Sequence, residues 1–146
     1  MPTESLLDGY PSRLAINIQW GDMDALLHVN NTVHFRWYES SRIAYLEESG
    51  ISTVMDSMQI GPILAAVNCN YKRQLRYPDR IQVGCKLARL GRSSLTLQHI
   101  VVSDELGQEA ADGESVVVMF DFENQRPVRI PEEVRGKISQ FESDTM

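Results

Sequence analysis

The sequence predicts a single α+β domain in which one strand and one long helix precede four strands. Three observations predict this order. Apolar and polar residues alternate between positions 13 and 20, and the apolar repeat lengthens to a helical period between 32 and 49. The alternation returns after Gly61-Pro62 and continues to about residue 123. A chain of 146 residues suits one domain with a hydrophobic core rather than two, so residues 1–146 are expected to fold as one unit.

The first half of the chain carries the signals for one strand and one enclosed helix. Arg13–Trp20 alternates as a half-buried strand does. Thr32–Ser49 is apolar around most of its girth, so the helix that it forms is expected to be enclosed by the sheet. Asn30 or Asn31 is suited to cap the start of this helix, and Gly50 is suited to end it.

The second half predicts four strands joined by short connections. The expected strands are Pro62–Tyr71, Arg80–Leu90, Ser93–Ser103 and Glu109–Phe122. Outside the sheet we expect a loose N-terminal tail (1–10), a short helical turn (Ile51–Met58), and a C-terminal helix and tail (131–146), with the helix over Pro131–Phe141 and Pro131 as its first residue. One helix cannot cover both faces of a five-stranded antiparallel sheet. A homodimer is therefore expected, and such dimers can pair further into a homotetramer.

The charge of the chain excludes one class of partner and favours another. A net charge of −6 argues against nucleic-acid binding, which needs a basic field. Residues 1–71 carry eight acidic and three basic side chains, whereas residues 72–92 carry seven basic and one acidic. The basic residues of that segment are Lys72, Arg73, Arg76, Arg80, Lys86, Arg89 and Arg92. Such a stretch suits a small polyanion, for example a nucleotide-bearing cofactor; the alternative is a hairpin whose solvent face is basic.

Neither a metal site nor a membrane segment is predicted. Cys69 and Cys85 lie in apolar runs without CxxC spacing, so we expect buried, reduced thiols rather than zinc ligands. The N-terminus lacks the basic and apolar regions of a signal peptide. The longest apolar runs, such as Val116–Phe120, are too short to cross a bilayer. A soluble protein with no membrane partner and a cytoplasmic location is expected.

The segment from Asp22 to Asn31 concentrates chemically active side chains. It places two carboxylates, Asp22 and Asp24, together with His28 and two asparagines between the first strand and the long helix. The first N–H groups of a helix have no partner within the helix and attract anions. A carboxylate beside such a group is suited to acyl-transfer chemistry, in which a carbonyl oxygen gains negative charge.

The residues of this segment and of the following helix resemble those of a known family. The similarity is to hotdog-fold acyl-CoA thioesterases, and in particular to the 4-hydroxybenzoyl-CoA thioesterase-like group. It is carried by Trp20-Gly-Asp-Met-Asp-Ala-Leu-Leu-His-Val-Asn-Asn31, then Phe35-Arg-Trp-Tyr-Glu39 and Arg42. The resemblance covers nearly the whole chain and implies a hotdog fold, a five-stranded antiparallel sheet wrapped around one long central helix. Leu27 departs from the family, which often has glycine at this position.

The resemblance also implies roles for individual residues. Asp24 is expected to be the catalytic carboxylate, acting either as a nucleophile that forms a mixed anhydride or as a general base that activates water. From the residues alone, the alternative is that Asp24 caps a turn. The backbone N–H of Asn31 is expected to bind the oxyanion. His28, Phe35 and Tyr38 are expected to line the substrate pocket, and the alternative for His28 is to hold its loop by hydrogen bonds.

The same resemblance predicts where coenzyme A binds. In similar thioesterases, nucleotide contacts come from the turn between two central strands and from basic residues near the last strand. The matching residues here are Arg92, Ser94 and Arg126. The alternative is that both arginines are ordinary solvated surface residues.

We therefore expect an enzyme that hydrolyses an acyl-CoA to a free carboxylic acid and coenzyme A. No metal or redox cofactor is expected, because coenzyme A is part of the substrate. An acyl carrier protein thioester is a close variant of that substrate. Two other functions stay open: a hotdog hydratase or dehydratase with Asp24 and His28 as an acid–base pair, and a non-catalytic hotdog protein that binds acyl-CoA.

Overall fold

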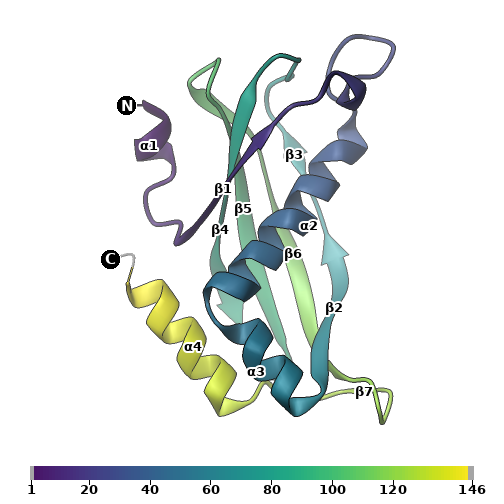
Figure 1. The fold of residues 1–146 in the computed structure, drawn as a ribbon, viewed down its shortest axis with the longest axis vertical. Helices are drawn as coiled ribbons and strands as arrows, with labels where there is room; N and C mark the ends of the chain where they lie inside the picture. The colour runs from purple at the N-terminus through teal and green to yellow at the C-terminus, as the bar shows by residue number, and fades with distance from the viewer. Residues whose placement is uncertain (1, 145–146) are drawn as a thin grey trace.

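The computed structural model describes residues 2–144 and shows the predicted order of elements (Figure 1). The helices are α1 (Pro2–Leu6), the single 3-10 turn η1 (Trp20–Asp22), α2 (Asn31–Glu48), α3 (Ile51–Met58) and α4 (Glu132–Ser143). The strands are β1 (Ser12–Asn17), β2 (Ile60–Val67), β3 (Asn70–Tyr71), β4 (Arg80–Leu90), β5 (Ser94–Ser103), β6 (Gln108–Asp121) and β7 (Arg126–Pro127).

The five longer strands form one antiparallel sheet in the order β1-β4-β5-β6-β2. The α+β class and the five-stranded sheet around a long helix are thereby confirmed. Two additional strands of two residues each, β3 and β7, also pair with β6. Figure 1 shows α2 running diagonally across one face of this sheet, with α3 and α4 near its C-terminal end.

The strand predicted over Pro62–Tyr71 is interrupted, and the structure shows why. It divides into β2 and β3, with a register shift between Leu64 and Ala66. At the break, the backbone of Asn68 lies so close to Gly113 of β6 that a Cβ atom at position 113 would collide with the Asn68 carbonyl oxygen. This close approach depends on a residue far away in the sequence, which local alternation does not reveal.

The residues that cap α2 position the loop before it. Asn30 is the N-cap, and its side chain accepts a hydrogen bond from the N–H of Thr32. Gly50 follows α2 in the left-handed region, with a φ of 86°, which favours glycine and lets α3 begin at once. At the other end of the chain, Pro131 was predicted to be the first residue of the last helix; it is instead the N-cap that precedes α4.

The N-terminal segment corrects one expectation. Residues 1–10 were predicted to be a loose tail, but α1 is helical, and Leu7 and Tyr10 are buried. These side chains form a cluster with Ile100 and Val102 of β5. The cluster is separate from the clusters that α2 forms with the sheet, because successive strand residues point to opposite faces. The apolar side chains of this segment thus fold back because they cover apolar residues of β5. Residue 1, like residues 145 and 146 of the predicted C-terminal tail, lies outside the described part.

No helix within residues 2–144 combines the length and the apolar character needed to span a membrane.

Candidate functional site

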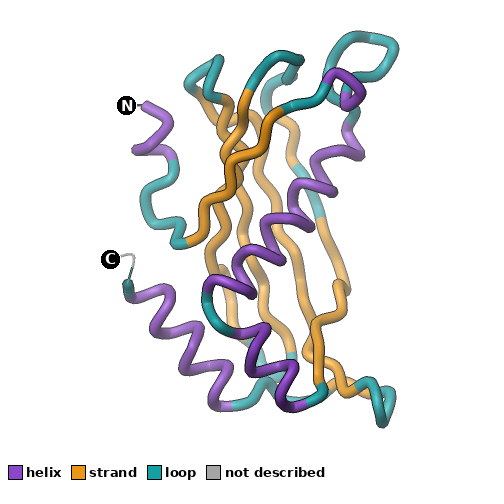
Figure 2. Tube along the Cα trace, viewed as in Figure 1, coloured by secondary structure: helices purple, strands orange, loops and turns teal. Residues whose placement is uncertain are grey.

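The loop between β1 and α2 is held in one shape by backbone and carboxylate hydrogen bonds. The carboxylate of Asp22 accepts the N–H of Gln19 at 2.8 Å, and its carbonyl oxygen accepts the N–H of Asn30 at 3.0 Å. Val29 donates its N–H to the carbonyl oxygen of Leu75 at 2.8 Å, which joins the loop to the segment after β3. Asp22 therefore braces the loop. Figure 2 shows this loop and the connection from β3 to β4 at the same end of the sheet.

Asp24 lies in a tight turn within this loop. Its Oδ1 atom accepts the N–H of Leu26 at 2.9 Å, so the turn-capping role is present. Among the described residues, no hydrogen bond to Oδ2 is formed. Leu27 adopts a φ of 63°, in the left-handed region, where glycine is the residue without strain. The carboxylate is exposed and keeps one oxygen available for a reaction.

The first N–H group of α2 is left without an acceptor. Asn30 binds the next two groups: its side chain accepts Thr32 N–H and its carbonyl oxygen accepts Val33 N–H, each at 3.0 Å. Within residues 2–144, the N–H of Asn31 forms no hydrogen bond. Because α2 has 18 residues, its N-terminus also carries the partial positive charge of a long helix.

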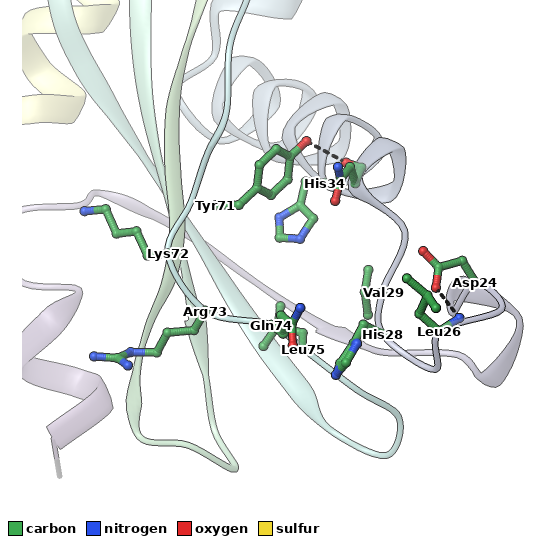
Figure 3. Close-up of a pocket in the computed structure, with 11 residues that line it drawn as sticks. Asp24, Leu26, His28, Val29, His34, Tyr71, Lys72, Arg73, Gln74 and Leu75 are labelled. Carbon is green, nitrogen blue, oxygen red and sulfur yellow. Dashed lines mark hydrogen bonds between the residues drawn. The ribbon is translucent and has the colours of Figure 1, made fainter.

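Asp24 and Asn31 line the same cavity, which has a volume of about 440 Å³. Figure 3 shows this cavity. Three chain segments form it: the loop, the start of α2, and the stretch from β3 onward. The lining residues are Asp24, Leu26, His28, Val29, Asn31, His34, Tyr71, Lys72, Arg73, Gln74 and Leu75. Asp24, with one carboxylate oxygen unpaired, and Asn31, with an unpaired N–H, therefore line the same cavity, and attack on a carbonyl group needs both kinds of group.

Two aromatic residues of this cavity wall were not singled out from the sequence. His34 is buried, and its Nδ1 atom has no hydrogen-bond partner among the described residues. Its burial lowers its pKa to about 4, so the ring is neutral near pH 7. Its ring packs edge-on against Tyr71, with 4.9 Å between centroids. Tyr71 lies 37 positions after His34, so the sequence does not reveal this contact. The one local signal for His34 is that it lies one helical turn after Asn31, on the same face of the helix.

The predicted pocket residues take different places. His28 is half-buried and lines the cavity. Tyr38 is fully buried and stacks on His99 of β5, with 4.6 Å between ring centroids and an angle of 11°. Phe35 is half-buried and packs edge-on against Tyr38. Neither Phe35 nor Tyr38 lines the cavity at the start of α2, because both point between the helix and the sheet.

The three residues predicted to bind coenzyme A lie at the opposite end of the sheet from Asp24. Arg92 is in the turn between β4 and β5, and Ser94 begins β5. Arg126 belongs to β7, which pairs with the last residues of β6. Figure 1 shows these elements at the lower end of the sheet, whereas the start of α2 is at the upper end. One chain therefore does not bring these residues to the cavity that Asp24 lines.

The basic segment 72–92 does not form one cationic patch. Lys72 pairs with Glu109 and Asp112, Arg80 with Asp104, and Arg89 with Glu114. Lys86 lies over the ring of Tyr10, 4.5 Å from its centroid. Most of these cations are thus partnered along the length of β4 and its neighbours, as in a hairpin with a basic solvent face.

Comparison with known proteins identifies the family. The family model of the thioesterase-like superfamily matches residues 18–138. Long-chain acyl-CoA thioesterase FadM of Escherichia coli K12 is 26% identical over 126 residues, which are 86% of this chain and 96% of the relative.

Solved structures share the fold along almost their full length. A thioesterase of Thermus thermophilus, solved with coenzyme A and zinc, is 32% identical, with 93% of this chain and 98% of that chain covered and a TM-score of 0.80. The DHNA-CoA thioesterase of Staphylococcus aureus, at 18% identity, shows the same fold, with 92% and 95% covered and a TM-score of 0.79. Since the family model spans most of the chain and the sheet and helix agree with it, the chain belongs to the thioesterase-like superfamily.

Proposed function

We propose that this chain is an acyl-CoA thioesterase in which Asp24 is the catalytic carboxylate and the N–H of Asn31 stabilises the oxyanion. The observation that carries the proposal is that Asp24 and Asn31 line one cavity, while the next two N–H groups of α2 are already paired. Membership of the superfamily supports thioester hydrolysis. Similarity to FadM and to a relative solved with coenzyme A supports acyl-CoA as the substrate class.

Two routes are compatible with this geometry. In the first, Asp24 takes a proton from water while the water oxygen attacks the thioester carbonyl carbon. In the second, Asp24 itself attacks, and water then hydrolyses the mixed anhydride. In both routes the carbonyl oxygen becomes negatively charged beside the N–H of Asn31, the C–S bond breaks, and coenzyme A leaves as a thiolate that takes up a proton.

The proposal includes a homodimer. β2 forms one edge of the sheet, and its residues 62–66 are exposed although they are apolar. If two β2 strands pair antiparallel around a two-fold axis, the Asp24 end of one subunit lies beside the opposite end of its partner. Arg92, Ser94 and Arg126 of one subunit would then serve the cavity of the other, and dimers could associate further into a tetramer.

A first experiment tests the carboxylate. Purified protein is mixed with a panel of acyl-CoA substrates, and release of the free thiol is followed. We expect Asp24→Asn to lower kcat by about 100-fold or more, since positioned acid–base groups contribute roughly 10²–10⁴. Asp22→Asn is the matched control from the same loop, because asparagine keeps an oxygen for the N–H of Gln19, and it should stay close to wild type. Full activity of Asp24→Asn would show that the assigned catalyst is wrong.

A second experiment removes the oxyanion donor alone. Proline at position 31 lacks the N–H, yet proline is well tolerated as the first residue of a helix. Asn30 has a φ of −62° and a ψ of 137°, a conformation that suits a residue before proline. Asn31→Pro should therefore keep the fold and lower kcat by roughly 10²–10³. Asn31→Ala, which retains the N–H, should lose far less; equal losses in the two variants would refute this role.

The same assay separates the other functions. The Asp24 carboxylate bonds Leu26 N–H rather than the His28 ring, but both residues line the cavity; an enzyme of the hydratase kind would add water to an enoyl thioester without releasing thiol. Binding of acyl-CoA without thiol release at any acyl length would indicate a non-catalytic binding protein. A carrier-protein thioester that is hydrolysed faster than acyl-CoA would favour the carrier-protein thioester as the substrate.

The proposal also includes two properties of the protein. It uses no metal or redox cofactor. It is located in the cytoplasm, which the free thiols of Cys69 and Cys85 support.

A further inference from the structure

Tyr71 contacts α2 at two points next to the unpaired N–H. Its hydroxyl group donates a hydrogen bond of 2.8 Å to the carbonyl oxygen of Asn31. Its ring packs against the ring of His34 at an angle of 88°. The first contact reaches the same residue whose N–H faces the cavity, and the second lies one helical turn further along α2. Figure 3 shows Tyr71 beside the start of α2, with a dashed line for this hydrogen bond.

The segment that carries Tyr71 is fixed to the sheet. Tyr71 pairs with Ala111 of β6. The N–H groups of Lys72 and Arg73 both donate to the carbonyl oxygen of Ala110, at 2.9 and 3.0 Å. The ammonium group of Lys72 also lies 2.9 Å from a Glu109 carboxylate oxygen and 3.0 Å from one of Asp112. The Tyr71 hydroxyl is therefore anchored through β6, independently of the loop that carries Asp24.

The first two residues of α2, Asn31 and Thr32, have little packing support. Asn30, Asn31 and Thr32 are exposed, and burial of the helix begins only at Val33. Side-chain packing, which orients the rest of α2, does not reach Asn31. Within residues 2–144, the hydrogen bond that joins Asn31 to the sheet is the one from Tyr71.

We infer that Tyr71 is a positioning residue, which holds Asn31 so that its N–H points at the site where the oxyanion forms. The inference rests on the proposed function. An oxyanion donor works only within a narrow distance of the developing charge, and a displacement of about 1 Å can cost 10²-fold in rate. Tyr71 has no contact of its own with the reacting atoms in this assignment; it acts through Asn31.

The test compares Tyr71→Phe with Tyr77→Phe. The first change removes the hydroxyl and keeps the ring against His34. The second is a matched control, since Tyr77 is 46% exposed against 43% for Tyr71 and its hydroxyl bonds no described residue. We expect Tyr71→Phe to lower kcat about 10-fold with KM within about twofold, with a melting temperature close to that of the control. The loss should be equal at pH 6 and pH 9, because burial raises the pKa of Tyr71 to about 12 and the hydroxyl stays a donor.

A second measurement needs no substrate. In an α-helix the N–H of Phe35 donates to the carbonyl oxygen of Asn31, so it reports on the first turn. Hydrogen exchange of this amide, followed by NMR, should be roughly fivefold faster in Tyr71→Phe than in wild type and unchanged in Tyr77→Phe.

The two measurements separate the inference from the proposed function. Unchanged exchange at Phe35, or a kcat equal to that of the control, overturns the role of Tyr71. If wild type releases no thiol from any acyl-CoA, the proposed function fails, and with it the catalytic meaning of the contact. Faster exchange together with a loss in kcat at constant KM supports the role.

Discussion

Among individual residues, a buried chain of polar groups ties α2 to the sheet. Arg42 donates a hydrogen bond of 3.2 Å to Ser115 Oγ, because a guanidinium group can only donate. Ser115 Oγ lies 2.8 Å from Nε2 of His99, and Ser41 Oγ lies 3.1 Å from Nδ1 of the same ring. In a neutral imidazole one ring nitrogen donates and the other accepts, so both nitrogens of neutral His99 have a hydroxyl partner.

The burial of His99 and His34 predicts that the fold is less stable in acid. Burial, and then the charge of Arg42, lowers the pKa of His99 to about 3, while burial lowers that of His34 to about 4. Both values lie below the ordinary 6.5, so the unfolded chain binds more protons below pH 6.5. The stability that these residues contribute is complete above pH 6.5 and is lost as the pH falls towards 4. Near pH 5 the free energy of unfolding should drop by about 2.7 kcal/mol per pH unit.

Urea unfolding at pH 7.5, 6.5, 5.5 and 5.0 measures this slope. In His34→Gln the slope near pH 5 should be about half that of wild type, because one histidine is gone. A free energy of unfolding that is constant from pH 5 to pH 7.5 would contradict the prediction.

Among the helices and strands, the accuracy of the sequence predictions follows from how local each signal is. β4 begins and ends at the predicted residues. The ends of α2 differ from the prediction by one residue each, because Asn30 and Gly50 lie next to the helix ends and signal them locally. The N-terminal helix was missed because five residues carry little helical preference, and burial against β5 decides the matter. Asp24 and Asn31 were singled out from the sequence because they lie only seven positions apart, within one local motif. The contact of Tyr71 with Asn31 spans 40 positions and was not.

Two glycines in different elements should respond to alanine with opposite sign. A Cβ at Gly113 would collide with the Asn68 carbonyl oxygen and lie 2.9 Å from the Tyr38 ring, whereas a Cβ at Gly136 of α4 would have open space beyond its own helix backbone. Gly113→Ala should destabilise the fold by about 1–3 kcal/mol. Gly136→Ala should stabilise it by about 0.5–1 kcal/mol, since alanine favours the helix. Denaturant unfolding measures both, and a Gly113→Ala variant as stable as wild type would contradict the predicted collision with Asn68.

In the complete fold, the two edges of the sheet differ. β1 exposes Arg13 and Asn17, which discourage pairing with another chain. β2 exposes Ile63 and Leu64, at 36% and 42% of their surface. The apolar edge is therefore the one suited to a second copy. Because α1 covers part of the far face of the sheet, this edge, rather than that face, is the surface expected to join two subunits.

A charge on the β2 edge should separate the subunits. We expect Leu64→Lys to run as a monomer in size-exclusion chromatography with light scattering, while wild type runs at twice the chain mass. Leu106→Lys, also exposed but in the turn between β5 and β6, is the control and should stay dimeric. The monomer should also lose kcat/KM, because the proposed coenzyme A contacts come from the partner. A wild-type chain that is monomeric at micromolar concentration would refute this arrangement.

The packing of Leu7 and Tyr10 on β5 has a practical consequence for recombinant production. A truncated chain that starts at Pro11 would leave Ile100 and Val102 bare on the outside of the sheet, and such apolar surface promotes aggregation. The first ten residues therefore belong in any expressed fragment, and an affinity tag is better attached through a flexible spacer than in their place.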